Sequence, residues 1–333
     1  MPASRFEQPL PTAEMTRVMT AIMRGESAPE EIRTFLTTLA RRGETAEEIA
    51  AGVQVLREHA VALPLSHPDA LCDTCGTGGD GRETINVSTL AALVAAATGV
   101  RIAKHGNRAA SSRCGSADLL DALGVNVQAS PAQVARCIDE AGFGFCFAPT
   151  FHPAMKVVAP IRKALGTRTI FNLIGPLANP APLTFQLVGV SESRLMRPMA
   201  EALVQLGIRH GMVVHGDDGL DEVTTTTTTS VLEVCEGSIT ADRLDPTALG
   251  LQRARLDALR GGDAARNAAI ARAILSDAPS MMRDIIVLNA GCALYVADRA
   301  TTIREGIEQA SESVASGRAR QLLDRVKELS HAG

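Results

Sequence analysis

The segment Asp73-Thr-Cys-Gly-Thr-Gly-Gly-Asp80 overlaps the end of an apolar run, Ala70–Cys75, that has the length and composition of a buried strand. Three glycines within four positions predict a tight turn after this strand, because glycine adopts positive φ angles without steric cost. A helix is expected soon after the turn, over Thr89–Thr98. A strand, a glycine turn and a helix form the first half of a βαβ unit, which indicates a parallel sheet.

The same alternation of strand and helix patterns continues through most of the chain. The further strands and helices that we expect are Val100–Ala103, Phe143–Phe147, Phe185–Val190 and Gly211–His215 as strands, with Ala117–Leu123 and Ser193–Leu206 as helices. The run Thr224–Thr229 is interpreted as a strand because threonine is β-branched, with a loop as the alternative. These patterns predict an α/β domain over residues 70–330.

The first 66 residues contain helical patterns and no strand pattern. Apolar residues between Met15 and Met23 recur at helical spacing. Ser27-Ala-Pro-Glu30 and Thr45-Ala-Glu-Glu48 have the pattern of capping boxes, so a second and a third helix are expected to begin there. Residues 152–182 interrupt the α/β alternation. We therefore expect a helical domain over residues 1–66, joined by helices from about residues 152–182.

The composition bounds the class of protein. The 333 residues are 46% hydrophobic and 3% aromatic, which is typical of a helix-rich α/β protein with a core of Ala, Leu, Val and Ile. A net charge of −4 gives no support for nucleic-acid binding. The seven cysteines have no regular spacing, which favours reduced thiols over a disulfide framework. The sequence also shows no signal-peptide pattern and no long apolar run. We therefore expect a cytoplasmic protein without membrane contacts.

Two polar segments are candidates for binding an anion. In Gly76–Asp80 and Asn86–Thr89, backbone N–H groups and hydroxyls can converge on a negative charge at the start of a helix. A purely structural turn is the alternative for the glycines. Lys104–Ser112 follows the second strand and packs a cation, amide and guanidinium donors and two hydroxyls into nine residues. Sheets of this kind bind ligands at the carboxyl ends of their strands.

Acidic residues and cysteines give two candidate metal motifs. Asp217-Asp-Gly-Leu-Asp-Glu222 follows the strand that ends at His215, and its carboxylates suit Mg²⁺ held between protein and pyrophosphate. An acidic surface turn is the alternative. Cys72 and Cys75 form a CxxC pair without a second pair, so packing is favoured over zinc binding. The remaining candidates for substrate contact are the histidines at positions 105 and 152.

Taken together, these segments resemble the anthranilate phosphoribosyltransferase family. The resemblance covers nearly the whole chain, and several motifs in the right order are more specific than any one of them. The motifs that carry it are Gly76–Asp80, Asn86–Thr89, Lys104–Arg108 with Ser111-Ser112, Gly115–Asp118, Arg168–Pro176 and Asp221-Glu222.

The resemblance implies a fold, a reaction and a cofactor. The fold is of the nucleoside phosphorylase and phosphoribosyltransferase type, in which a small N-terminal helical domain is hinged to a larger α/β domain with a mainly parallel sheet. The reaction is transfer of the phosphoribosyl group from 5-phosphoribosyl 1-pyrophosphate to the amine of anthranilate, in tryptophan biosynthesis. The cofactor is Mg²⁺, with two ions per subunit, and the enzyme is expected to be a homodimer.

The same resemblance implies site residues, and none of them is a covalent nucleophile or a strong general base. Ser88, Asp221 and Glu222 would bind magnesium, while Gly76, Asn107 and Arg162 would contact anthranilate. The residues that would hold phosphoribosyl pyrophosphate are Gly76, Gly79, Asp80, Thr84, Asn86, Val87, Ser88, Thr89, Lys104, His105, Gly106, Asn107, Arg108, Ala109, Ala110, Ser111, Ser112 and Ser116.

Two alternative functions stay open. A pyrimidine nucleoside phosphorylase has a similar glycine turn and a similar Lys-x-Gly-x-Arg segment, but Asp221-Glu222 and Arg168–Pro176 argue against it. A non-catalytic relative that binds nucleic acid would be expected to have a basic face and a degraded pyrophosphate loop. The sequence shows neither feature.

Overall fold

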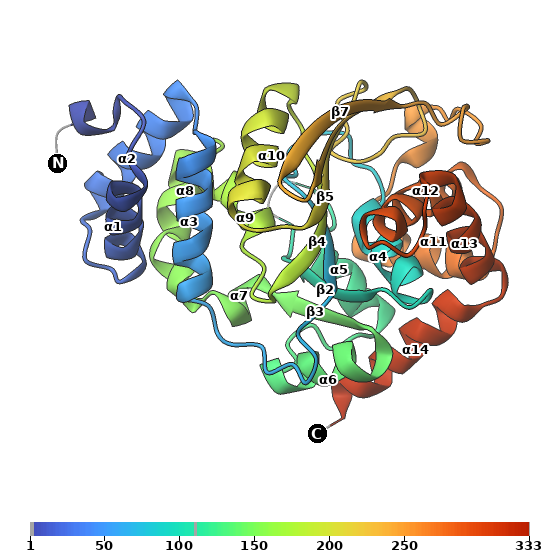
Figure 1. Cartoon of the computed structure of the whole chain (residues 1–333). Coiled ribbons are helices and arrows are strands. Elements are labelled where there is room, and N and C mark those ends of the chain that lie inside the picture. The colour runs from blue at the N-terminus through green and yellow to red at the C-terminus, as the bar shows by residue number, and fades with distance from the viewer. Residues whose placement is uncertain (1–2, 110–111, 333) are drawn as a thin grey trace.

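A seven-stranded sheet lies at the centre of the larger part of the molecule, in the order β3-β2-β1-β4-β5-β6-β7 (Figure 1). This statement and those below refer to residues 3–109 and 112–332, which the computed structural model describes. Strands β1 to β5 pair in parallel, and β6 and β7 extend the sheet antiparallel. The mainly parallel sheet is therefore confirmed. The strands are β1 Leu71–Gly76, β2 Arg101–Gly106, β3 Phe143–Phe147, β4 Leu183–Gly189, β5 His210–Gly216, β6 Thr229–Cys235 and β7 Ser238–Leu244.

Helices precede, connect and follow the strands. Within the described residues, none of them is long and apolar enough to cross a membrane. The α-helices are α1 Thr12–Met23, α2 Pro29–Arg42, α3 Ala46–Glu58, α4 Val87–Ala96, α5 Ser116–Leu123, α6 Pro131–Ala141, α7 Ala148–Phe151, α8 Ala159–Leu165, α9 Ile170–Leu177, α10 Met196–Gln205, α11 Ala264–Leu275, α12 Met281–Val296, α13 Ile303–Ala315 and α14 Arg318–His331. Short 3-10 helices are η1 Ala3–Phe6, η2 Pro153–Val157, η3 Ser193–Leu195 and η4 Leu256–Leu259.

The two faces of the sheet pack against different helices, because successive side chains of a strand point to opposite faces. Met212 and Val214 of β5 belong to the core that α4 and α12 share. Val213, between them, belongs to the core that includes α10. Nearly every residue of α4 is apolar and buried, which places this helix, and the turn that precedes it, firmly against the sheet.

The smaller part of the molecule is helical and begins with α1, α2 and α3, which are blue in Figure 1. The apolar face predicted for α1 is buried, from Met15 to Met23. Helices from the middle of the chain lie beside it, since α8 contacts α2, and α9 contacts both α2 and α3. Helix α3 also contacts α10 of the larger part. The chain therefore passes between the helical part and the α/β part more than once.

The start of α2 differs from the predicted capping box by one residue. Ala28, rather than Ser27, precedes the first turn, and the carboxylate of Glu31 accepts the N–H of Ala28 at 3.3 Å. Pro29 then occupies the first helical position, where its fixed φ fits and its missing N–H is not needed. The second predicted box, over Thr45–Glu48, is confirmed.

The interpretation of Thr224–Thr229 as a strand is wrong for all but its last residue, with which β6 begins. The rest of the run is a loop. Thr224 and Thr226 both donate their hydroxyls to the carboxylate of Asp218, which lies just before them in the same turn. These local bonds offer the chain an alternative to strand pairing, and here they outweigh the β-branched preference for a strand.

Candidate functional site

Four neighbouring parallel strands end in glycine at the same edge of the sheet: β2 at Gly106, β1 at Gly76, β4 at Gly189 and β5 at Gly216. Parallel strands place their carboxyl ends together, and sheets of this type bind ligands just outside those ends. A ligand site is therefore expected at the edge of the sheet that these glycines form.

Polar side chains of the following turns occupy the space that the glycines leave. A Cβ atom on Gly76 or on Gly189 would overlap Asp221, and a Cβ atom on Gly106 would overlap the hydroxyl of Ser116. Glycine is required at these strand ends for close approach. Alanine at any of them would displace a polar group from the edge of the sheet.

The turn after β1 needs glycine for a different reason. Gly78, Gly79 and Gly81 have φ angles of 65°, 81° and 67°, in the left-handed region that other residues rarely adopt. A Cβ atom on any of the three would meet nothing within 4 Å. Backbone conformation, not crowding, is thus the constraint, and a turn of this conformation can direct backbone N–H groups toward an anion.

Asp221 and Glu222 lie against this turn and against the first turn of α4. The N–H of Gly78 donates to Asp221 Oδ2 at 2.7 Å, and the N–H of Ser88 donates to Glu222 Oε1 at 3.2 Å. Burial, and then the neighbouring Asp80, raises the pKa of Asp221 to about 6. Burial, and then Asp221, raises the pKa of Glu222 well above its usual range. The structure thus brings together acidic groups that repel one another.

A divalent cation would relieve this repulsion, and oxygen ligands of this kind suit Mg²⁺. The described residues contain no group of three or more His, Cys, Asp or Glu side chains arranged to hold a metal ion by themselves. Magnesium in phosphate sites commonly uses one or two carboxylates and completes its ligands with phosphate and water. The donor set at Asp221 and Glu222 fits that kind of site.

The prediction that the polar segment follows the second strand is wrong for its first residues, because Lys104 lies within β2. Its side chain is buried, it donates to the carbonyl of Thr74, and its Nζ lies 3.5 Å from the hydroxyl of Ser88. The ammonium group is therefore a fixed positive charge beneath the first turn of α4. It lowers the raised pKa values of the buried acids Asp73 and Glu222, although burial remains the larger effect.

The loop after β2 is held by its own polar groups. The hydroxyl of Ser116 accepts the N–H of Asn107 at 3.2 Å, and Arg108 pairs with Asp118 at 2.9 Å and with Asp121 at 3.1 Å. The predicted residues Ala110 and Ser111 lie outside the described residues. The others on this loop are near one another, with the N–H of Ala109 bonded to Asp118 and the hydroxyl of Ser112 to Cys114.

The side chain of Asn86, a predicted phosphate ligand, makes two hydrogen bonds within the protein. Its amide donates to the carbonyl of Cys114 at 2.9 Å and accepts from Asn267 at 3.0 Å. Thr84 forms an isolated bridge with Arg260. Sequence patterns gave no sign of Asn267, since it lies on α11, far along the chain. The other two predicted residues, Val87 and Thr89, are buried in the first turn of α4.

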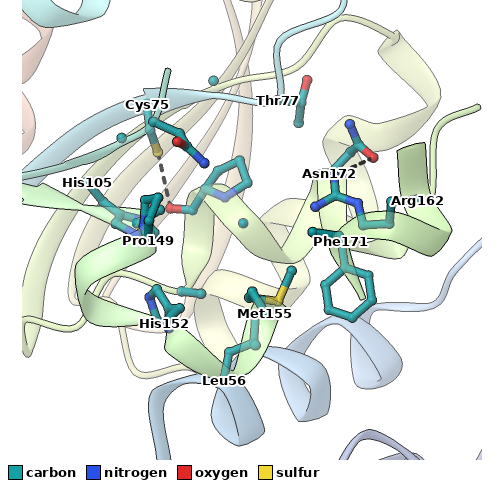
Figure 2. Close-up of a pocket in the computed structure, with 18 of the residues that line it drawn as sticks. Leu56, Cys75, Thr77, His105, Pro149, His152, Met155, Arg162, Phe171 and Asn172 are labelled. Carbon is teal, nitrogen blue, oxygen red and sulfur yellow. Dashed lines mark hydrogen bonds between the residues drawn. The ribbon is translucent and has the colours of Figure 1, made fainter. Parts of the chain in front are cut away.

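A pocket of about 420 Å³ opens between the ends of β1 and β2 and the helices around α8 and α9 (Figure 2). It brings Gly76, Asn107 and Arg162, which are far apart in the sequence, onto one lining. Arg162 is partly buried, its Nη2 lies 3.4 Å from Asn172 Oδ1, and its guanidinium lies over the ring of Phe171. Burial lowers the pKa of Arg162 from its ordinary value.

Several residues that line this pocket carried no signal in the sequence. Leu56, Pro149 and Met155 are apolar and come from α3, α7 and η2 (Figure 2). Such residues are indistinguishable from core residues until the fold brings them together. Phe171, by contrast, lies in the motif Arg168–Pro176. Cys72 and Cys75 are both buried, and Cys75 lines the pocket as well.

His105 and His152 also line the pocket, with ring centroids 5.1 Å apart. Burial, and then the neighbouring His152, lowers the pKa of His105 to about 3. Burial also lowers the pKa of His152. Both rings are therefore neutral at physiological pH, and the positive charge on the pocket lining comes from Arg162 and from the exposed Lys156.

Comparison with known proteins gives one family over almost the whole chain. The family model described as the glycosyl transferase family helical bundle domain matches residues 4–60, and the a/b domain of the same family matches residues 68–320. An anthranilate phosphoribosyltransferase of Rubrobacter xylanophilus is 51% identical over 319 residues, which cover 96% of this chain and 93% of the relative. That of Symbiobacterium thermophilum is 47% identical, over 97% and 94%.

Solved structures agree with the fold. The crystal structure of anthranilate phosphoribosyltransferase from Thermus thermophilus has a TM-score of 0.94 and 47% identity, and each chain is covered completely. The Saccharomyces cerevisiae enzyme in complex with PRPP and Mg has a TM-score of 0.88 and 29% identity, over 96% of this chain and 93% of that one. The predicted fold class, a helical N-terminal part with a larger α/β part, is confirmed.

Proposed function

The chain belongs to the anthranilate phosphoribosyltransferase family, and we propose that it catalyses the reaction of that name. It transfers the phosphoribosyl group of phosphoribosyl pyrophosphate to the amine of anthranilate and releases pyrophosphate, a step of tryptophan biosynthesis. One observation carries the proposal. A carboxylate pair set against a glycine turn, Asp221-Glu222, adjoins a pocket whose lining includes Arg162.

The edge of the sheet is the proposed site for phosphoribosyl pyrophosphate. The glycine turn, with left-handed backbone at Gly79 and Gly81, and the amino end of α4 offer backbone donors to the pyrophosphate. Lys104 adds a fixed positive charge below them. The proposed ligands are those predicted from the sequence on the glycine turn, on the first turn of α4 and on the loop that follows β2.

We place magnesium at Ser88, Asp221 and Glu222, with two ions per subunit. The yeast relative has been solved with PRPP and Mg. When bound, the metal neutralises the pyrophosphate and makes it a better leaving group. The protein's own contribution is to hold both carboxylates in place, through the N–H groups of Gly78 and Ser88.

The pocket is the proposed site for anthranilate. Its volume of about 420 Å³ lies within the usual range for small-molecule sites. Apolar residues such as Leu56 and Met155 suit an aromatic ring, and Arg162 can bind the carboxylate through two parallel hydrogen bonds. Gly76 and Asn107 lie where the pocket meets the edge of the sheet, so the amine faces the ribose.

This arrangement suits a reaction that needs positioning more than acid–base chemistry. The amine of anthranilate is a neutral nucleophile with a free lone pair, and the ribose becomes oxocarbenium-like as pyrophosphate departs. Catalysis then depends on alignment and on charge stabilisation. Closure of the helical part over the α/β part would keep water away from the activated ribose.

Three further properties belong to this proposal. The domains are residues 1–66, joined by helices from about residues 152–182, and residues 70–330. The enzyme forms a homodimer through its helical part. It works in the cytoplasm, in keeping with seven cysteines that are all free.

The direct test is to mix the protein with anthranilate, phosphoribosyl pyrophosphate and Mg²⁺ and to follow the fluorescence of anthranilate. We expect a change that requires all three components and that a metal chelator abolishes. Phosphorolysis of thymidine without Mg²⁺ would instead favour a pyrimidine nucleoside phosphorylase. A salt-dependent gel shift with nucleic acid would favour the non-catalytic relative.

A further inference from the structure

The turn that carries Asp221 and Glu222 belongs to no helix or strand. It runs from the end of β5 to the start of β6. Within it, the N–H of Gly216 donates to the carbonyl of Leu220 at 2.9 Å, which closes the first half of the turn. The second half, where the chain passes from Glu222 to Val223, needs an anchor of another kind.

Asn289 on α12 supplies that anchor. Its Oδ1 accepts the N–H of Val223 at 3.0 Å, and its Nδ2 donates to the carbonyl of Val223 at 2.8 Å. The same Nδ2 donates to the carbonyl of Ile285 at 2.8 Å, one turn back along α12. The amide therefore pairs with both backbone groups of Val223, as a neighbouring strand would, and its own helix fixes its orientation.

Asn289 lies in a buried and otherwise apolar part of α12. Residues 285–294 of α12 are all buried, and Asn289 is the polar side chain in that otherwise apolar or small run. Asn289 and Val223 are both almost fully buried. A polar side chain at such a position is costly unless its hydrogen bonds are made, and here they all go to backbone groups.

We propose that Asn289 is a positioning residue for the magnesium site. It fixes the backbone directly after Glu222, so that the carboxylates of Asp221 and Glu222 face the glycine turn before any ligand arrives. This inference rests on the proposed function, because it takes those two carboxylates as metal ligands. Asn289 itself touches neither substrate nor metal.

The other contacts of the two carboxylates come from the opposite side. Gly78 and Ser88 donate to them from the glycine turn and from α4, the same segments that are proposed to hold phosphoribosyl pyrophosphate. Asn289 acts from behind the turn, on α12, and its three hydrogen bonds all go to backbone groups of the protein.

The test compares the wild type with Asn289→Leu, which keeps a similar volume and removes all three hydrogen bonds. Asn289→Ser is the milder variant in case the first does not fold. The matched control is Asn126→Leu. Asn126 also bonds through its amide to backbone groups, but it ties a loop to α14, which contributes no residue to the proposed site.

Two measurements on the full-length protein are needed besides the rate. The first is binding of Mn²⁺ in the presence of phosphoribosyl pyrophosphate, followed by electron paramagnetic resonance. The second is hydrogen exchange of residues 216–224 in metal-free protein. For both Asn289 variants we expect Mn²⁺ affinity to fall by roughly 10- to 100-fold, as for other residues that support metal ligands. Exchange in the turn should accelerate, and the KM for anthranilate should stay unchanged.

The outcomes separate this inference from the proposed function. Asn126→Leu should lose stability but keep the wild-type Mn²⁺ affinity. If the Asn289 variants bind Mn²⁺ as the wild type does, and their turn exchanges no faster, the inference is wrong. If the wild type itself binds no Mn²⁺ with the substrate, the metal assignment fails. The exchange of residues 216–224 then still decides whether Asn289 holds the turn.

Discussion

The glycine turn between β1 and α4 and the pocket beside α8 and α9 are adjacent, yet they are ordered in different ways. At the turn, backbone groups fix the geometry, through positive φ angles at Gly78 and Gly79 and N–H bonds to carboxylates. In the pocket, side chains from separate segments meet, and Arg162 has a long contact to Asn172 and lies over the ring of Phe171. The first region is suited to hold a pyrophosphate rigidly, whereas the second can adapt to the acceptor.

The largest effect is expected at the carboxylates. The double variant Asp221→Ala, Glu222→Ala should lose magnesium-dependent turnover by roughly a thousandfold or more, because the metal's stabilisation of the leaving group is worth several kcal/mol. Its thermal unfolding should stay cooperative. The matched control is Asp245→Ala with Asp257→Ala, which removes the same charge at a half-buried and an exposed site with local arginine partners. Full activity in the first double variant would contradict the metal assignment.

The pocket half is tested by Arg162→Ala. A charge-assisted bidentate contact is worth on the order of 2–3 kcal/mol, so the KM for anthranilate should rise by roughly 30- to 150-fold. The KM for phosphoribosyl pyrophosphate should hardly change, because Arg162 belongs to the proposed anthranilate pocket and is none of the proposed pyrophosphate ligands. Lys163→Ala, the next residue of α8 and an exposed one, is the control. Equal increases in the KM values for both substrates would contradict the assignment of separate roles to the turn and the pocket.

The turn half is tested by Gly79→Ala. A left-handed φ costs a residue with a Cβ atom roughly 1–2 kcal/mol, so affinity for phosphoribosyl pyrophosphate should fall by about tenfold in calorimetry. Gly207→Ala provides the control, since Gly207 has a φ of 76° and equally open space at the end of α10. It should lose similar stability and bind the substrate normally. Normal binding by the Gly79 variant as well would leave the turn a purely structural one.

The smallest effect concerns pH and the metal-free protein. Because the pKa of Asp221 is raised to about 6 in the folded state, that state binds more protons than the unfolded chain from about pH 4 to 6. Asp221 therefore contributes less stability as the pH rises through this window. Replacing it by Asn should raise the Tm relative to the wild type by a few degrees at pH 7 and by little at pH 4. A Tm difference that does not vary with pH would argue against the raised pKa.

The contrast between the two regions also explains what the sequence could predict. The glycine turn is local, so its residues and its conformation follow from one short segment. The pairing of Glu222 with Ser88 joins residues far apart in the chain, and only the family resemblance indicated it. The threonine run was misjudged because hydroxyl bonds to Asp218 outweighed β-propensity. Asn289 could have been noticed as a lone polar residue in an apolar helix, but its partner could not.

The meeting of Gly189 with Asp221 has a consequence for anyone who wishes to redesign the enzyme. Residues at the ends of the strands are locked by steric contact, since even a methyl group on Gly189 would collide with the backbone that carries the acidic pair. Random libraries that include these positions would contain mostly inactive variants. The side chains of Met155 and Leu56, in contrast, lie at the pocket (Figure 2). Saturation mutagenesis at these two positions should therefore yield variants that accept bulkier aromatic amines while the donor half of the reaction stays intact.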